Sequence, residues 1–263
     1  MNQISNFVSV FVARRRWLKK PLRPILPKKA YYKMKNGLNF YFDPRDLKGP
    51  SYQFSYNLER GFENFERESK EELLSRIPEN GVFFDIGANI GMYSLFIAHQ
   101  RKDISLFCFE PERTVFECLK SSFDHLNRTN ICLFNYAVGS SHQRKKRAAL
   151  INIDELYSQG KILSPDAIKI NVEGYELAVL ESMSELIQKE KPVMLIECNN
   201  EDLSAKDEFW NYIYCNLSID YQVKVPGEEK LMTIDQLPDY AKFKLDECEM
   251  LTNYLFIPMA SLI

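Results

Sequence analysis

Residues 82–91 read Val-Phe-Phe-Asp-Ile-Gly-Ala-Asn-Ile-Gly, and this stretch decides the fold class of the chain. Its first half is a short apolar run, typical of a strand that is buried on both faces of a sheet. Its second half contains Gly87 and Gly91, which permit a tight turn and the close approach of a ligand to the backbone. The stretch therefore predicts a strand and a glycine loop, followed by a helix over 92–100, with Asp85 at the strand end.

Strand-like and helix-like segments alternate on both sides of this stretch. Strands are expected at 38–42, 104–109, 130–138, 167–171, 193–197 and 254–258, and helices at 63–77, 112–126, 176–189 and 209–215. Apolar strands separated by helices predict an α/β fold, with a mostly parallel, twisted sheet and helices on both faces. Ligands of such sheets bind at the carboxyl ends of the strands, so those ends are the places to search for a site.

Two strand ends carry features of a nucleotide-type cofactor site. Asn89 stands where a dinucleotide fingerprint needs its second glycine, and the chain has no phosphate-binding P-loop motif, so both of those sites are disfavoured. Glu110 ends the strand after the loop, where a carboxylate can accept hydrogen bonds from both hydroxyls of a ribose. Pro111 follows it and suits the first turn of a helix.

A third strand end holds a cluster of polar side chains. Residues 168–176 read Ile-Lys-Ile-Asn-Val-Glu-Gly-Tyr-Glu, so Asn171, Glu173 and Glu176 lie where a strand gives way to a helix. Carboxylates at a helix N-terminus are stabilised by the helix dipole, and a capping role is therefore one interpretation. A functional role at the strand end is the other.

These segments together resemble a known family. FFDIGANIGMYSLFIA, FCFEPE, NYAVGS, NIDEL, IKINVEGYELAVL and VMLIEC occur in the order and style of the FkbM family of methyltransferases, over roughly residues 80–200. The resemblance implies a Rossmann-like class I methyltransferase fold with S-adenosylmethionine (SAM) as the methyl donor. It also implies transfer to oxygen, usually to a hydroxyl of a sugar, a glycolipid or a complex natural product.

The resemblance also assigns roles to residues of this chain. The loop would contact the methionine part of SAM, Glu110 would hold the ribose beside Pro111, and Ala137 with Val138 would lie beside the adenine. Asn171 and Glu173 would face the reaction centre. The expected cofactor-binding residues are therefore Asp85, Gly87, Ala88, Asn89, Gly91, Glu110, Pro111, Ala137, Val138 and Asn171.

Asn171 departs from the family pattern, which usually has Asp at this position. An amide cannot accept a proton as a general base, so Glu173 is expected to act as the base, with Glu197 as the second candidate. A rival hypothesis is a SAM-binding scaffold or regulator that has lost its chemistry. A divalent metal held by Asn171, Glu197 and Asn199 is a further alternative, but only one of the three is charged, and no metal is expected.

A second departure is the short connection from Val138 to Ile153. It contains the basic run 144–147. This run is expected either to be a solvated loop or to contact an anionic acceptor. The acceptor itself is expected to be a small molecule or a glycan.

The charge of the chain is distributed very unevenly. The net charge is −2, yet residues 1–42 contain ten Lys or Arg and no Asp or Glu. The remainder therefore has 34 − 10 = 24 bases against 36 acids, a net charge of −12. A basic segment on an acidic body indicates an anionic partner for that segment.

The N-terminal segment also has an apolar stripe, because Ile4, Phe7, Val8, Phe11 and Val12 recur at helical spacing. The stripe is too short to span a bilayer. It is expected to pack on the protein's own core or on a second subunit, or else to lie on an anionic membrane surface. Nucleic acid is a weaker alternative, because no binding module matches. Three prolines, at 21, 24 and 27, predict a linker after the helix.

These features divide the chain into a basic amphipathic arm (1–36), a strand and a helix that pack on the core (37–80), and a SAM-binding domain (81–263). Six scattered cysteines without a C-x-x-C pair indicate free thiols in a reducing compartment. The expected location is therefore the cytoplasm, with peripheral contact to a membrane as a further possibility. The oligomeric state stays open.

Overall fold

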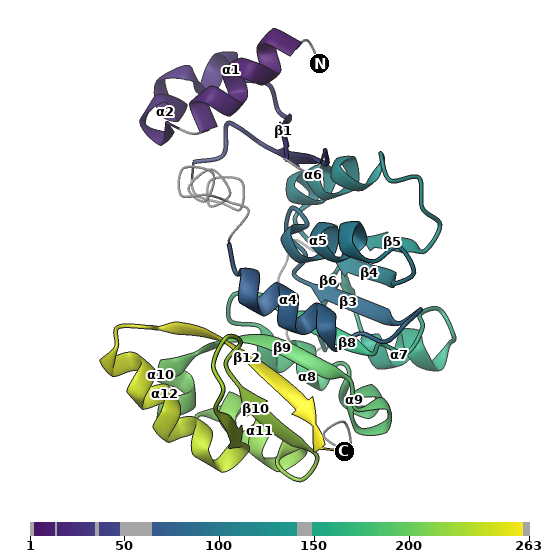
Figure 1. The fold of residues 1–263 in the computed structure, drawn as a ribbon, viewed down its shortest axis with the longest axis vertical. Coiled ribbons are helices and arrows are strands. Elements are labelled where there is room, and N and C mark those ends of the chain that lie inside the picture. Colours follow the sequence, from purple (N-terminus) through teal and green to yellow (C-terminus); the bar gives the residue numbers. More distant parts are fainter. Residues whose placement is uncertain (1–2, 14, 35–36, 48–64, 141–148, 260–263) are drawn as a thin grey trace.

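The computed structural model describes residues 3–13, 15–34, 37–47, 65–140 and 149–259 of the chain (Figure 1). The basic run 144–147 and the first two residues of the helix expected at 63–77 lie outside these ranges. No helix within them combines the length and the apolar character that crossing a bilayer requires.

The core is an eight-stranded sheet in the order β11-β10-β12-β9-β8-β3-β4-β5 (Figure 1). Five of its strands are parallel to one another: β3 (Val82–Ile86), β4 (Ser105–Phe109), β5 (Ile131–Phe134), β8 (Ala167–Ile170) and β9 (Val193–Asn199). Beyond β9 the sheet continues antiparallel through β12 (Leu251–Pro258), β10 (Tyr221–Lys224) and β11 (Leu231–Thr233). The Rossmann-like α/β fold with a mostly parallel sheet is confirmed.

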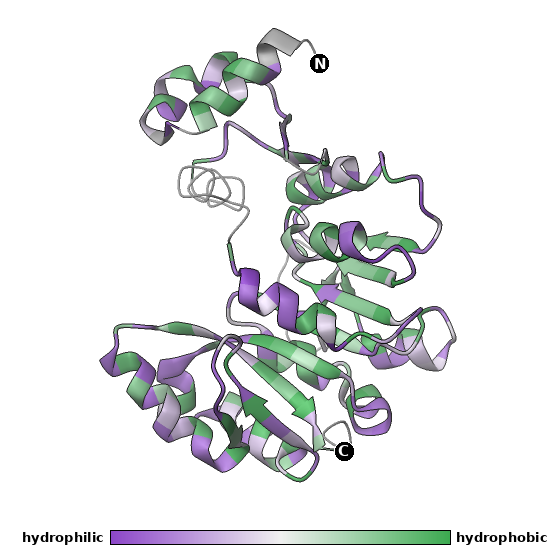
Figure 2. Ribbon diagram, viewed as in Figure 1, coloured by the Kyte–Doolittle hydropathy of each residue, from purple (hydrophilic) through white to green (hydrophobic). Residues whose placement is uncertain are grey.

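Helices cover both faces of this sheet because successive side chains of each strand point to opposite sides. Phe84 belongs to one hydrophobic cluster, which the helices α8 (Glu176–Glu181), α9 (Ser184–Glu190) and α11 (Glu208–Leu217) share. Phe83 belongs to the other cluster, which is shared by α4 (Arg67–Ser75), α5 (Met92–Gln100) and α6 (Arg113–Phe123). Figure 2 shows the strands as predominantly hydrophobic and the helices as mixed, as two-sided burial of the sheet requires.

Two expected elements are each divided in the structure. The strand expected at 130–138 forms β5 and, after a break at Asn135, β6 (Ala137–Val138), which leaves the main sheet to pair with β7 (Leu150–Ile151). The helix expected at 176–189 is interrupted at Met183 and forms α8 and α9. Elements that the sequence did not suggest are β1 (Ala30–Lys33), β7, β10, β11, α7 (Ile153–Ser158), α10 (Asn200–Ala205) and α12 (Leu237–Asp246).

The N-terminal segment packs onto the body at the α6 end of the molecule (Figure 1). It consists of α1 (Gln3–Ala13), short helical turns η1 (Arg16–Leu18), α2 (Lys19–Leu22) and η2 (Arg23–Ile25), and the antiparallel hairpin of β1 with β2 (Asn39–Phe42). Helical turns therefore stand where a linker was expected. The hairpin pairs residues on both sides of the boundary that was expected after residue 36. The division of the chain into three parts stays a prediction.

The expectation that the apolar stripe of α1 packs on the protein's own core is wrong for most of its described side chains. Phe7, Val8 and Phe11 are exposed, and of the stripe Val12 is buried. The helix is turned so that the small residues Ser9 and Ala13 face inward with Val12. Small side chains let the helix approach the body closely, and this leaves the larger aromatic residues on the outside.

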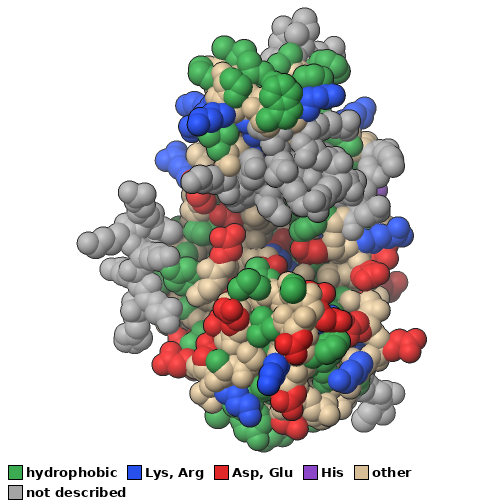
Figure 3. All heavy atoms as spheres, turned by 90° about the vertical axis from the view of Figure 1, so that its left-hand side faces the viewer, with side chains coloured by type: hydrophobic (Ala, Val, Ile, Leu, Met, Phe, Trp, Pro, Cys, Tyr) green, Lys and Arg blue, Asp and Glu red, His purple; other side chains and the backbone are tan. Residues whose placement is uncertain are grey.

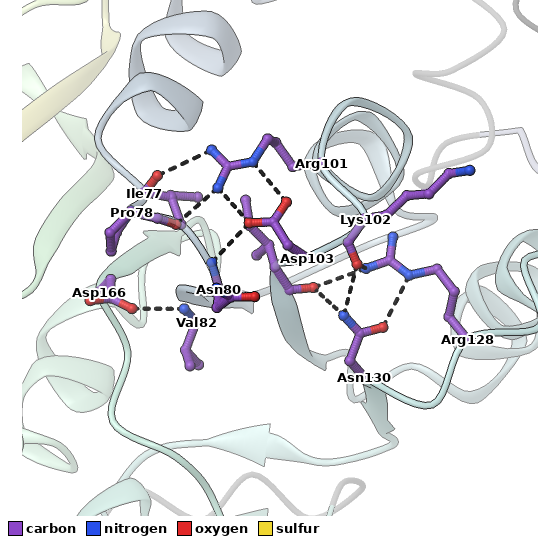
Figure 4. Close-up of polar contacts among 11 residues, drawn as sticks. Ile77, Pro78, Asn80, Val82, Arg101, Lys102, Asp103, Arg128, Asn130 and Asp166 are labelled. Atoms are coloured by element: carbon purple, nitrogen blue, oxygen red, sulfur yellow. Dashed lines mark hydrogen bonds and ion pairs between the residues drawn. The ribbon is translucent and has the colours of Figure 1, made fainter.

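The loops at the amino ends of the strands are joined by a polar network (Figure 4). The guanidinium of Arg128 donates to the carbonyl oxygens of Ala98, Lys102 and Ile104, each over 2.8–2.9 Å. Asp166 accepts from the backbone N–H of Val82 over 2.7 Å, which ties the starts of β3 and β8 together. These contacts stabilise the amino ends of the strands. The candidate site lies at the other end of the sheet, at the carboxyl ends of the strands.

Candidate functional site

Asp85 is a buried carboxylate at the end of β3, beside the glycine loop. Its Oδ2 accepts hydrogen bonds from the hydroxyl and the backbone N–H of Ser94, in the first turn of α5. Its Oδ1 has no hydrogen-bond partner among the described residues and lies 4.0 Å from Nζ of Lys169, on the neighbouring strand β8. Burial raises the pKa of Asp85, whereas Lys169 and Ser94 oppose that rise. The acid therefore orients the start of α5 through one oxygen and leaves the other available.

The glycine loop is held between β4 and β8. The N–H groups of Gly87 and Ala88 both donate to the carbonyl of Phe109, over 3.0 and 2.9 Å. Gly87 has a φ of +75°, and a Cβ atom there would collide with the carbonyl oxygen of Asn171. No side chain can be accommodated at position 87, because the backbone of the β8–α8 connection occupies that space. The structure thus brings the glycine loop into contact with the segment 168–176, which the sequence singled out separately.

Glu110 joins the end of β4 to the same loop. Its two carboxylate oxygens accept from the N–H of Asn89 (2.9 Å) and the N–H of Glu112 (2.8 Å). Burial raises the pKa of Glu110 to about 7, against the opposite effect of these two hydrogen bonds. Each carboxylate oxygen can accept more than one hydrogen bond, so Glu110 retains acceptor capacity for a ligand hydroxyl.

A cavity of about 250 Å³ lies at the carboxyl ends of β3 and β4. Gly87 lies on one side of it, and the two-stranded sheet of β6 and β7 contributes Ala137, Val138 and Leu150. Its remaining lining residues are Ile86, Phe109, Pro111, Tyr136, Gly139, Ser140, Val172, Tyr175 and Ala178. The cavity is mostly apolar, a character that suits the faces of a flat heterocycle. Four of the expected cofactor-binding residues, Gly87, Pro111, Ala137 and Val138, therefore line one cavity.

The polar cluster after β8 has different roles for its members. Glu176 accepts from the N–H of Val172 (3.1 Å) and the N–H of Gly174 (3.0 Å), so it fixes the turn that precedes α8. Glu173 is exposed and has a φ of +53°. Asn171 donates its N–H to the carbonyl of Ile86 over 3.1 Å. Glu176 thus supports the turn before α8 and does not cap the helix itself, whereas Glu173 presents its side chain to solvent.

Glu197 lies half-buried on β9, the strand next to β8. Burial raises its pKa, Lys169 opposes this, and the acids Glu66, Glu176 and Glu173 add to the rise. Their influence places Glu197 in the same acidic region as Glu173. An acid with a raised pKa is a better proton acceptor than a solvated carboxylate.

The metal alternative depends on the oxygens of Asn171, Glu197 and Asn199, and it stays a prediction. Asn199, one of the three candidate ligands, caps α10 with its side-chain oxygen, which accepts from the N–H of Glu201 over 2.9 Å.

Four further residues adjoin this site, although the sequence did not assign them: Lys169, Tyr93, Glu66 and Ser94. Lys169 lies 3.4 Å from the carbonyl of Gly87 and 5.3 Å above the ring of Tyr93. The hydroxyl of Tyr93 donates to Glu66 over 2.6 Å. The available signal for Lys169 was a charged residue within the apolar run of β8, and for Ser94 a small polar residue facing inward from α5.

Comparison with known proteins agrees with the resemblance found in the sequence. Residues 142–218 match the profile of the methyltransferase FkbM domain, and this resemblance is confirmed for that part of the chain. The matched range includes Asn171, Glu173 and Glu197 but not the glycine loop. The hexuronic acid methyltransferase AglP of Haloferax volcanii is 29% identical over 136 residues, which are 44% of this chain and 55% of AglP. The chain thus spans about half the length of this relative.

Two solved structures are similar to this chain over most of its length. The methyltransferase FkbM of Methylobacillus flagellatus covers 93% of this chain and 59% of its own length, with 17% identity and a TM-score of 0.49. The match to TYW2 of M. jannaschii in complex with AdoMet (SAM) covers 88% of this chain and 85% of TYW2, with 12% identity and a TM-score of 0.48. The fold assignment rests on the strand order described above.

Proposed function

We propose that the chain is a SAM-dependent methyltransferase that methylates a hydroxyl of a sugar, a glycolipid or a complex natural product. One observation carries the proposal: the glycine loop, Glu110 and an apolar cavity adjoin at the carboxyl ends of β3 and β4. The FkbM match and the similarity to a hexuronic acid methyltransferase support the reaction class and the sugar acceptor.

The residues present fit this cofactor. Oδ1 of Asp85 is a buried acceptor to which no described residue donates, and Gly87 lines the apolar cavity without a side chain. Glu110 would hold the ribose, and the apolar walls at Ala137 and Val138 would enclose the adenine. SAM supplies an activated methyl group on a sulfonium, and the protein aligns the acceptor oxygen with it.

Removal of the acceptor proton is assigned to an acid near Asn171. Glu197 and Glu173 are the two candidates, and the raised pKa of the half-buried Glu197 favours it as the proton acceptor over the exposed Glu173. The variants Glu197→Gln and Glu173→Gln, compared in kcat against pH, distinguish the two. The base is the residue whose replacement by Gln lowers kcat, on the order of 100-fold, and removes the acidic limb of the profile.

The experiment for the whole proposal has two stages. Calorimetric titration with SAM and with NAD is expected to show binding of SAM alone. Incubation with methyl-labelled SAM and a panel of neutral sugars, hexuronic acids and glycans is then expected to label an acceptor. Label that survives mild alkali is an ether on a hydroxyl, whereas label released by alkali is an ester on a carboxylate and contradicts the hydroxyl assignment.

The rival scaffold function depends on Asn171, which cannot act as a base. It predicts SAM binding without transfer to any acceptor. Under that function Asn171→Asp would create activity that the natural chain lacks. Under the proposed function the natural chain is active, and Asn171→Asp changes its rate without creating a new reaction.

A further inference from the structure

An apolar patch is exposed on the outer face of the N-terminal helices. Phe7, Trp17 and Ile25 are 72%, 75% and 74% exposed, and Phe11 is 43% exposed. They come from α1, η1 and η2, and we refer to these four residues as the N-terminal apolar patch. Figure 3 shows hydrophobic side chains gathered at the upper end of the molecule, where Figure 1 places α1 and α2. Such a group of exposed apolar residues marks an interaction surface.

The patch is held facing outward by contacts on the other side of the segment. The side-chain oxygen of Asn6 accepts from the N–H of Tyr31 over 2.8 Å. The ammonium of Lys19, which is fully buried, donates to the carbonyl of Asp46 over 3.1 Å. Ser9 is also fully buried beneath the helix. Since these contacts fix the inner side, the patch cannot turn inward without breaking them.

Positive charge surrounds the patch. Arg15, Lys20, Arg23 and Lys28, from the same stretch of the chain, are exposed, and the guanidinium of Arg15 lies 4.1 Å above the ring of Phe11. No acid occurs in residues 1–42. In Figure 3, Lys and Arg flank the hydrophobic side chains at the upper end, and Asp and Glu appear further down the same face. The partner must therefore be anionic and also accept apolar side chains.

We propose that this patch binds the surface of a bilayer that contains anionic lipids. Aromatic and aliphatic side chains with neighbouring cations suit the boundary between headgroups and acyl chains. Phe7, Trp17 and Ile25 enter that boundary, and the four cations contact the lipid phosphates. A second copy that offers the same patch would bring two positive surfaces together, and a polynucleotide would leave the aliphatic Ile25 without a suitable contact.

The test uses the full chain and flotation with phosphatidylcholine vesicles, with and without phosphatidylglycerol. Binding is expected only with phosphatidylglycerol and is expected to weaken with added salt. The double variant Phe7→Ser/Trp17→Ser and the triple variant Lys20→Glu/Arg23→Glu/Lys28→Glu should each lower the partition coefficient at least about tenfold. The matched control is Ile219→Ser, because Ile219 is 80% exposed but lies on the body.

Tryptophan fluorescence gives an independent readout. The chain has two tryptophans, so Trp210→Phe leaves Trp17 as the single reporter. Its emission should shift to shorter wavelength when phosphatidylglycerol vesicles are added, because the indole leaves water. Neither readout requires methyl transfer, so failure of the proposed function leaves this test intact.

Three results would overturn the proposal. The first is equal binding to neutral and anionic vesicles, or to neither. The second is full binding by the Phe7→Ser/Trp17→Ser variant with an unchanged melting temperature. That result would mean that charge alone accounts for the binding. The third is a dimer in light scattering that the same variant converts to monomer, which assigns the patch to a second copy.

Discussion

The carboxylate of Glu110 accepts a hydrogen bond from the backbone N–H of Asn89 over 2.9 Å, and so the end of β4 is fastened to the glycine loop. Because the same carboxylate has a pKa raised to about 7, the loop is held by a group that titrates near neutrality. The proposed cofactor site is therefore expected to respond to pH.

The affinity for SAM should rise with pH up to about 7 and then level off. Ribose hydroxyls that donate to Glu110 favour its ionised form, so cofactor binding lowers the raised pKa and releases a proton. Calorimetry at pH 7 in two buffers of different ionisation enthalpy measures this release. Glu110→Gln is expected to bind more weakly and without the pH dependence, and an unchanged dependence in this variant would assign the proton to another group.

The same shift has a consequence for stability without cofactor. The folded-state pKa of Glu110 lies above its ordinary value of 4.5, so the folded state holds the proton more tightly than the unfolded state. Its contribution to stability is therefore greatest below pH 4.5 and is lost as the pH rises towards 7. The melting temperature of Glu110→Gln should therefore depend less on pH over this range than that of the natural chain.

Gly87→Ala should destabilise the protein and abolish cofactor binding. The new Cβ would collide with the carbonyl oxygen of Asn171, and the positive φ adds about 1 kcal/mol of backbone strain. Gly160→Ala is the matched control, because Gly160 also has a positive φ (+66°), but no described atom lies within 4 Å of the place where its Cβ would be. Thermal unfolding of both variants separates collision from strain, and equal losses would mean that the contact with Asn171 relaxes freely.

Lys169→Met should lower stability by about 3 kcal/mol near neutral pH, because it leaves the buried Asp85 without its nearby cation. The loss should diminish as the pH falls, since a protonated Asp85 no longer needs a counter-charge. The double variant Asp85→Asn/Lys169→Met is the control and should recover a large part of the loss. Denaturant unfolding at several pH values measures these differences, and equal losses in the single and double variants would show that the two side chains are not coupled.

Arg128→Ala should cost about 1–3 kcal/mol of stability, because the carbonyl of Ala98 loses its side-chain donor and those of Lys102 and Ile104 keep only the amide of Asn130. The affinity for SAM should stay unchanged, since Arg128 lies at the amino ends of the strands (Figure 4). Arg67→Ala is the control, because Arg67 forms an exposed ion pair with Glu71 and its loss should matter far less. A change in SAM affinity in Arg128→Ala would show that the two ends of the sheet are coupled.

The alternation of apolar strands and helices was sufficient to predict the parallel part of the sheet. Buried strands such as β3 and β8 are apolar except for one charged residue each, and α5 was predicted with the bounds that the structure shows. The antiparallel part was largely missed, because β10 and β11 are short and each mixes polar with apolar residues. Their place in the sheet depends on pairing with β12, which a local pattern does not reveal.

The candidate site could be predicted where its residues stand at recognisable strand ends. The glycine loop and Glu110 mark strand ends, and strand ends of a parallel sheet meet at one edge. The role of Lys169 depends on the pairing of β3 with β8, which places it opposite Asp85 from far along the chain. Likewise, the outward position of Phe7 and Phe11 depends on which side of α1 packs on the body, and the stripe alone did not decide between the protein's own core, a second subunit and a membrane surface.

The position of β12 between β9 and β10 also constrains the order in which the protein can fold during synthesis. Both neighbours precede β12 in the chain, so neither can acquire its final partner until residues 251–258 have left the ribosome. Until then the edge of β9 presents unpaired backbone groups, a risk for aggregation that grows when translation is slow. Ribosome-bound chains that stop before residue 251 should therefore depend on chaperones more than chains that include β12.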